Sequence, residues 1–176
     1  MLIEINSCEI CDNKHLDSLV DLGNHPLCDD LIPLGDYRTC KEYPIEILFC
    51  SKCITAHQRF QVRKDNLFPK NYHYRSQNTG DVLNGLQQIV DYCERSLFAL
   101  QDKKILDVGC NDGSLLSLFR KKNAKTFGIE PTNAYREALQ SGHEVINSFF
   151  DEKIAIDFVK NYGQPDLITF TNVFAH

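Results

Sequence analysis

Four of the eight cysteines form two C-x-x-C pairs in the first third of the chain. The pairs are Cys8 with Cys11 and Cys50 with Cys53, and 38 residues lie between them. Each pair presents two thiolates from one tight turn, so the four sulfurs can close a tetrahedron around Zn²⁺ at about 2.3 Å. A closed shell of four cysteines leaves no position for water, so we predict a structural zinc ion whose binding stabilises the fold. The alternatives are two accidental pairs or a redox dithiol.

The remaining cysteines are Cys28, Cys40, Cys93 and Cys110. An even number of cysteines is also typical of secreted disulfide scaffolds. The N-terminus lacks a basic segment followed by an apolar run and a cleavage site, so we expect a cytoplasmic protein with reduced thiols. In a reducing compartment, scattered cysteines are usually small buried hydrophobes.

A glycine-rich turn follows an apolar run in the second half of the chain. The run 104–108 leads into Gly109-Cys110-Asn111-Asp112-Gly113, and a helical pattern begins at Ser114. Ligands of open α/β sheets bind at the carboxyl ends of strands, where glycines allow close approach and a helix N-terminus favours an anionic group. A dinucleotide fingerprint would need glycines in place of Asn111 and Ser114, so NAD is excluded. What remains is a nucleoside site or a well-packed turn without a ligand.

Two acidic residues lie at the ends of neighbouring predicted strands. Asp107 precedes the glycine turn, and Glu130 follows the next apolar run, 126–129. A carboxylate at the end of the second strand can accept hydrogen bonds from both ribose hydroxyls of an adenosine. We therefore predict a nucleoside ligand, with Asp107 ionised.

Changes of hydrophobic period divide the chain into three segments. Residues 1–70 mix short apolar runs with turn residues, which predicts strands and loops around a metal. Residues 71–102 are predicted to form a connector and a long helix capped by Asn78 or Thr79. The apolar face of this helix repeats every three and four residues, at Val82, Leu86, Ile89, Val90, Cys93, Leu97 and Leu100.

Residues 103–176 alternate strand and helix. The predicted strands lie at 105–108, 126–129, 144–146 and 167–170, and the predicted helices at 114–122, 133–141 and 152–161. Strict alternation implies right-handed crossovers and a parallel sheet. The sequence therefore predicts an α/β fold in which a small zinc-binding module precedes a partial Rossmann-like domain.

The charge distribution argues against a nucleic acid partner. The formal net charge is −5, and residues 1–70 carry eight Lys and Arg against eleven Asp and Glu. A zinc ribbon that binds phosphate backbones would need a basic surplus. No apolar stretch approaches the roughly 18 residues of a membrane span, so we expect no membrane partner either.

The order of five motifs along the chain resembles that of the S-adenosylmethionine-dependent sugar C-methyltransferases. The motifs are the four-cysteine module and the segments 71–76, 106–113, 128–131 and 172–176. The resemblance implies an N-terminal zinc-binding domain, a Rossmann-like methyltransferase core and a C-terminal domain. It also implies methylation of a keto-deoxysugar that is attached to a nucleotide.

The resemblance assigns roles to individual residues. It implies that the methionine part of S-adenosylmethionine (SAM) is lined by Asp107, Gly109, Asn111, Asp112 and Gly113. It implies that Glu130 binds the ribose, that Pro131 also belongs to the cofactor site, and that the adenine and sulfonium region is flanked by Phe149, Phe150 and Asn172. Methylation beside a ketone requires a base and a proton donor, and these catalytic roles would fall to His176, Tyr72 and Tyr74.

The family pattern continues beyond 172–176 with more strands, further catalytic residues and a second lobe. We therefore expect the chain to lack robust methyl transfer on its own. Three interpretations remain: a chain cut short, a split gene whose second chain supplies the C-terminal half, or a degenerate remnant. The rival hypothesis is a zinc-stabilised binding module without catalysis that partners a full-length methyltransferase.

Overall fold

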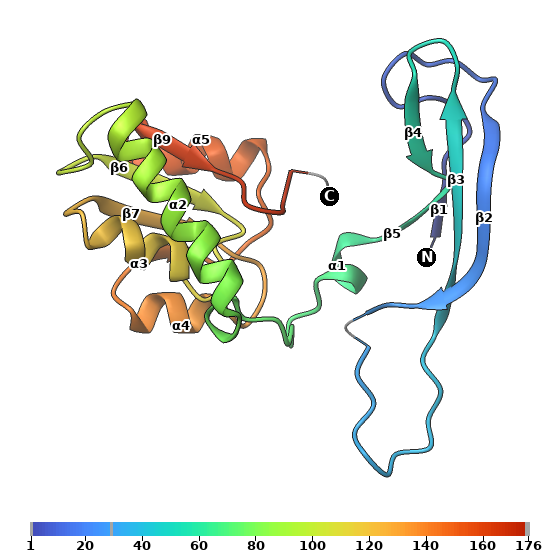
Figure 1. Ribbon diagram of the computed structural model, residues 1–176, viewed down its shortest axis with the longest axis horizontal. Helices are drawn as coiled ribbons and strands as arrows, with labels where there is room; N and C mark the ends of the chain where they lie inside the picture. Colours follow the sequence, from blue (N-terminus) through green and yellow to red (C-terminus); the bar gives the residue numbers. More distant parts are fainter. Residues whose placement is uncertain (1, 29, 175–176) are drawn as a thin grey trace. The chain divides into compact units, whose positions relative to one another are not determined.

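The computed structural model describes residues 2–28 and 30–174, and the chain divides into two units, Met1–Pro69 and Lys70–His176 (Figure 1). The connector and the long helix belong to the second unit. Each unit is described by itself.

The first unit is built from antiparallel strands. β1 (Leu2–Glu4) pairs with β5 (Phe60–Val62), and β2 (Asp17–Pro26), β3 (Glu42–Cys50) and β4 (Thr55–Gln58) form a sheet in the order β2-β3-β4. A short helix, α1 (Lys64–Leu67), follows β5. Among the described residues of this unit, the buried ones are Cys8, Leu48, Cys50 and His57. The buried centre is therefore the cysteine cluster rather than an apolar core.

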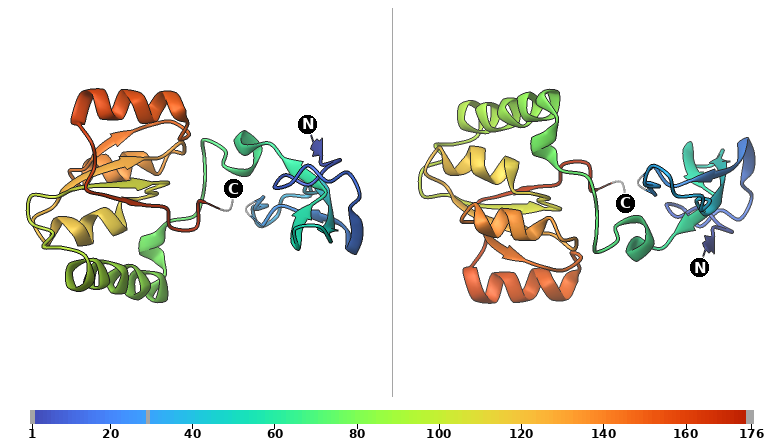
Figure 2. Two further views of the ribbon diagram at one scale, coloured as in Figure 1. Left: turned by 90° about the horizontal axis from the view of Figure 1, so that it is seen from above. Right: turned by 90° about the horizontal axis from the view of Figure 1, so that it is seen from below.

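The second unit is a four-stranded parallel sheet between helices. The strand order is β8 (Glu144–Ile146), β7 (Lys125–Ile129), β6 (Lys104–Val108), β9 (Leu167–Thr169). One face of the sheet is covered by α2 (Gly80–Ser96) and α3 (Ser114–Arg120), and the other by α5 (Glu152–Tyr162), as Figure 2 shows. The short helices are η1 (Ser76–Asn78) and α4 (Tyr135–Gln140). The predicted alternation and parallel sheet are confirmed.

Two apolar clusters fill the space between the sheet and its helices. Ile105 packs with Leu86 of α2 and Phe119 of α3, whereas its neighbour Leu106 packs with Phe158 of α5. Alternate residues of β6 thus face opposite layers, as the two-residue period of a strand requires. Burial on both faces explains why this strand is continuously apolar, and its central position brings the glycine turn to the middle of the carboxyl edge.

The helix α2 differs from the prediction at both ends. Thr79 is the N-cap residue, but its side chain makes no capping hydrogen bond. Leu97 is 52% exposed because the helix ends at Ser96, whereas Leu100 is buried in the apolar cluster. No helix in the described part of the chain combines the length and the apolar character needed to cross a membrane.

Candidate metal and cofactor sites

The four cysteine sulfurs converge as a metal site requires. All four Sγ atoms lie within 4.8 Å of one another, with Cys8 and Cys53 3.4 Å apart and Cys11 and Cys50 3.7 Å apart. Four sulfurs at about 2.3 Å from a zinc ion would lie about 3.8 Å apart at the corners of a tetrahedron. The cluster therefore fits the predicted zinc ion, and four cysteine ligands leave no open position for catalysis.

The electrostatics of the cluster call for a cation. Burial opposes ionisation of Cys8, yet backbone N–H groups of Ile10 and Cys11 lower its pKa to about 6. The Asn13 backbone favours the thiolate of Cys11, but burial and the other three cysteines raise its pKa to about 12. The four sulfurs therefore ionise together only when a metal ion compensates their charge.

Three side chains outside the cluster contact its sulfurs. The pairs are Asn13 Nδ2 with Cys50 at 3.4 Å, Thr55 Oγ1 with Cys53 at 3.2 Å, and His57 Nε2 with Cys8 at 3.1 Å. His57 is buried, and its Nδ1 lies 3.6 Å from Glu9 Oε2. Hydrogen bonds to ligating sulfurs orient them and help to retain the metal. The sequence predicts no role for His57, because the residues next to it in the sequence do not indicate that the chain folds back to bring it against Cys8.

Both glycines of the turn have left-handed backbone geometry, with φ of +72° at Gly109 and +80° at Gly113. A Cβ atom on Gly109 would collide with the Val173 side chain. A Cβ atom on Gly113 would lie 2.9 Å from the side chains of Ala138 and His143. Close packing within the protein therefore requires both glycines, whether or not a ligand also approaches them.

Two buried carboxylates lie at the carboxyl edge of the sheet. Asp107 Oδ1 accepts a 2.6 Å hydrogen bond from Thr169 Oγ1, and Glu130 Oε2 accepts one of 2.9 Å from the Asn111 backbone. Glu130 Oε1 accepts two more, from the backbone and the hydroxyl of Thr132. Burial raises the pKa of Asp107 to about 7, opposed by the Thr169 hydroxyl and increased by Glu130. The expectation of a fully ionised Asp107 is therefore wrong for the protein without a ligand.

The glycine turn carries a negative potential. Burial raises the pKa of the Cys110 thiol, and the charges of Asp107, Glu130 and Asp112 raise it further. None of these three acids takes part in an ion pair among the described residues. Buried acids without a cationic partner favour the binding of a cationic ligand.

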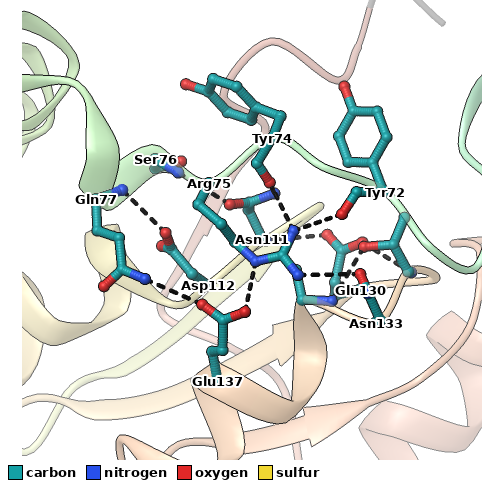
Figure 3. A network of polar contacts seen from close by, with 12 residues as sticks. Tyr72, Tyr74, Arg75, Ser76, Gln77, Asn111, Asp112, Glu130, Asn133 and Glu137 are labelled. Carbon is teal, nitrogen blue, oxygen red and sulfur yellow. Dashed lines mark hydrogen bonds and ion pairs between the residues drawn. The ribbon is translucent and has the colours of Figure 1, made fainter. Parts of the chain in front are cut away.

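Asn111 and Asp112 contact Tyr74 and the first two residues of η1 (Figure 3). Asn111 Oδ1 accepts a hydrogen bond from the Ser76 backbone at 3.0 Å, and its Nδ2 donates to the Tyr74 carbonyl at 3.1 Å. Asp112 Oδ2 accepts a hydrogen bond from the Gln77 backbone at 2.9 Å. These two side chains, predicted to line the methionine of the cofactor, thus hold this segment on the glycine turn.

The other predicted site residues are partly or fully exposed. Phe150 packs against the apolar cluster under α5 and meets Phe170 with ring centroids 5.8 Å apart. Tyr72 and Tyr74 lie side by side with centroids 6.5 Å apart. Phe149 and Pro131 are half-buried, Asn172 is exposed in a turn with φ of +55°, and His176 lies outside the described residues.

Comparison with known proteins places the chain in a family. Residues 74–176 match the family described as "Methyltransferase domain", and residues 8–68 match the one described as "Putative zinc binding domain". The first match covers more than half of the chain, so the chain belongs to the methyltransferase domain family. Its class is that of the SAM-dependent methyltransferases, here with a zinc-binding module ahead of the methyltransferase domain.

A curated relative and two of the similar solved structures show the extent of the likeness. C-methyltransferase NovU of Streptomyces niveus is 25% identical over 176 residues, which are 98% of this chain and 41% of that protein. The chain therefore spans about two fifths of this relative. Magnesium protoporphyrin IX methyltransferase of Synechocystis PCC 6803 with bound SAH is 17% identical, with a TM-score of 0.41 over 52% of this chain and 42% of that one. The structure of the same enzyme with bound SAM is 16% identical, with a TM-score of 0.42 over 52% of this chain and 45% of that one.

The carboxyl edge of the sheet fits SAM. This cofactor carries a sulfonium and an ammonium group, and the buried acids Asp107, Asp112 and Glu130 provide the opposite charge. Glu130 Oε1 already accepts two hydrogen bonds, whereas Oε2 accepts one and can take another from a ribose hydroxyl. Glu130 thus has room for one direct ribose contact rather than the two that the sequence suggests.

Proposed function

We propose that the chain is the cofactor-binding part of an enzyme that methylates a ring carbon of a nucleotide-linked keto-deoxysugar. One arrangement supports this most. Buried acids at the glycine turn lie next to a segment that carries two tyrosines. The relative NovU is named a C-methyltransferase, and its match runs along 98% of this chain.

The proposed chemistry requires a nucleophilic carbon. SAM, when bound, supplies an electrophilic methyl group. A carbon beside a ketone becomes nucleophilic when it loses a proton and the enolate oxygen is stabilised. We assign the stabilising hydrogen bond to the phenol of Tyr72 or Tyr74, and the proton transfer to His176, because histidine is the side chain most suited to exchanging protons near neutral pH.

We further propose that additional polypeptide, from the same protein or from a second chain, covers β9. Among the described strands, β9 pairs with β6 alone. Ile168 and Phe170 are 45% and 37% exposed, and Phe174 is 87% exposed. Parallel sheets are normally covered on both faces, and exposed strand edges favour association.

Calorimetry with SAM tests the cofactor site. We expect SAM to bind the chain. The variant Glu130→Gln should bind SAM at least about tenfold more weakly, because a neutral amide accepts hydrogen bonds from the ribose more weakly than a carboxylate does. Glu144→Ala, an exposed acid at the start of β8, serves as the matched control and should bind normally. Equal affinity of the Glu130→Gln variant would contradict the site.

Product formation tests the reaction. Methyl transfer to a nucleotide-linked keto-deoxysugar is measured with this chain alone and with added polypeptide corresponding to the remainder of NovU. We expect little product alone, product with the complement, and a loss of about tenfold or more for Tyr72→Phe or Tyr74→Phe. SAM binding without transfer to any such sugar in either setting would reject the proposed substrate class.

The second candidate is a zinc-stabilised binding module without catalysis. It is favoured by one observation: Asn111 and Asp112 are already engaged by the protein itself. If calorimetry shows no SAM binding by the intact chain, this candidate replaces the first.

A further inference from the structure

Residues 70–77, which we call the strap, are held on the rest of the second unit by individual hydrogen bonds rather than by a strand ladder. The Ser76 and Gln77 backbone amides donate to Asn111 and Asp112, as described above, and the Asn133 amide donates to the Lys70 carbonyl at 2.8 Å. Such single hydrogen bonds are individually weak in water. An additional anchor is therefore needed to hold the strap in one conformation.

Arg75 provides that anchor (Figure 3). Its Nε donates to Glu137 Oε1 at 2.6 Å, and its second terminal nitrogen, NH2, donates to Asn133 Oδ1 at 3.0 Å. Its first terminal nitrogen, NH1, donates to the carbonyls of Tyr72 at 2.7 Å and Tyr74 at 2.8 Å. Four acceptors thus surround one guanidinium, and the Arg75 side chain is only 13% exposed.

This arrangement depends on the planar fork of arginine. One edge of the guanidinium faces α4 and the loop before it, while NH1 faces two carbonyls of the strap itself. A lysine ammonium is a compact charge that can pair with Glu137 but cannot reach both sets of acceptors in one plane. Glu137 also accepts from Gln77 Nε2 at 3.0 Å, so its carboxylate ties two strap residues to α4.

The same contacts orient the two tyrosines. Because the carbonyls of Tyr72 and Tyr74 meet the same nitrogen, the backbone between them curves around Arg75. Both phenol rings lie on the side of the strap away from Glu137, as Figure 3 shows, with their centroids 6.5 Å apart. NH1 of Arg75 is shared by both carbonyls, and the Tyr74 carbonyl also accepts a hydrogen bond from Asn111 Nδ2.

We infer that Arg75 is a positioning residue that holds Tyr72 and Tyr74 at the cofactor edge by clamping the strap between α4 and the glycine turn. The inference rests on the proposed function for the role of the tyrosines. The attachment of the strap stands on its own contacts. Arg75 acts through its contacts with the strap rather than on the reacting atoms.

Amide hydrogen exchange at Ser76 and Gln77 tests the attachment in the full chain. We expect Arg75→Met to raise both exchange rates at least about tenfold and Arg75→Lys to raise them less, because lysine keeps the pair with Glu137. Arg136→Met is the matched control, since Arg136 is exposed on α4 and lies over the Tyr135 ring. Unchanged exchange in Arg75→Met would overturn the inference.

A second variant covers the case in which Arg75→Met also loses protection in β6 and β7 and so fails to fold. Glu137→Gln keeps the shape of the partner and removes only its charge. We expect it to raise the exchange rates of Ser76 and Gln77 about threefold or more while β6 and β7 stay protected. No increase in this variant would overturn the inference as well.

Kinetics separate positioning from general support of the fold. We expect kcat for methyl transfer to fall at least about tenfold in Arg75→Met, the Kd for SAM to change less than about threefold, and Arg75→Lys to recover part of kcat. An unchanged kcat with a released strap, or equal losses in kcat and SAM affinity, would overturn the positioning role. These kinetics are measured with the added polypeptide that corresponds to the remainder of NovU. If the unmodified chain with this complement methylates no keto-deoxysugar, the proposed function fails, and the exchange experiment alone decides the clamp.

Discussion

Asp107 owes its properties to burial in a negatively charged edge of the sheet. A carboxyl group whose pKa is raised to about 7 binds a proton in the folded protein at pH values where the unfolded chain has lost it. Folding stability should therefore fall as pH rises from about 4 to 7 and then level off. A cationic ligand favours the ionised form of Asp107 and so offsets this loss of folding stability. The buried acid thus lowers the stability of the ligand-free protein and favours binding of the ligand.

We predict that Asp107→Asn stabilises the ligand-free protein and weakens SAM binding. The amide keeps an acceptor for the Thr169 hydroxyl but has no charge to bury, so the gain should be about 1–3 kcal/mol at pH 8 and small at pH 4. Urea unfolding at the two pH values measures the gain, and calorimetry should show an affinity loss of about tenfold or more. A variant no more stable than the unmodified protein at pH 8 would contradict the prediction.

The zinc ligand Cys8 depends on a neighbour that is not a ligand. His57 lies 3.1 Å from its sulfur and is buried beside it. A donor in this position stabilises the thiolate and limits its motion.

We predict that His57→Phe, which removes the donor, releases zinc to a competing chelator about 10 to 100 times faster. His57→Gln should recover part of the loss because its amide can still donate, and His15→Ala, an exposed histidine, is the control. Zinc release is followed by the absorbance of the chelator complex. Equal release rates for His57→Phe and the control would show that the contact does not support the metal.

At the scale of elements, the glycine turn between β6 and α3 is a tightly constrained connection. Gly113 is left-handed and faces Ala138 and His143, while Cβ atoms at Gly85 in α2 would meet nothing within 4 Å. The two glycines therefore differ in what a methyl group would do. One is required by packing, and the other is a weak point in a helix.

We predict opposite stability changes for Gly113→Ala and Gly85→Ala. The first should cost about 2 kcal/mol, through its positive φ and the 2.9 Å contacts. The second should stabilise the protein by about 0.5–1 kcal/mol, because alanine is the better helix former. Thermal unfolding by circular dichroism measures both, and a tolerated Gly113→Ala would mean that the turn can shift by several tenths of an ångström.

Across the whole molecule, the two units are stabilised by different interactions. The buried residues of the first unit centre on the cysteines. In the second unit, apolar clusters lie on both faces of the sheet. A unit with so little buried apolar surface relies on metal binding for its folding free energy.

We predict that removing zinc unfolds the first unit and leaves the second folded. After chelation, amides in the β2-β3-β4 sheet should lose exchange protection while those of β6 and β7 keep it. Cys50→Ser should give the same pattern without chelator, and Cys93→Ser, a buried cysteine of α2, should not. Protection of the first sheet that survives complete metal loss would contradict the prediction.

Patterns local in sequence determined most of the architecture. The C-x-x-C pairs indicated the Cys8 cluster, the uninterrupted apolar run of β6 indicated a strand buried on both faces, and the acids Asp107 and Glu130 pointed to the ligand edge. Each signal resides in a few adjacent residues, because periodicity, tight turns and strand ends are local properties.

Only the tertiary structure decided which side chains serve the ligand and which serve the fold. Arg75 forms hydrogen bonds with Glu137 and Asn133, which lie about sixty residues further along the chain. His57 contacts Cys8, which lies 49 residues before it. Burial, which no single residue type encodes, raised the pKa of Asp107. Long-range contacts and desolvation arise when distant segments pack together, which is why the contacts of Asn111 with Ser76 and Tyr74 could not be predicted from its position in the glycine turn.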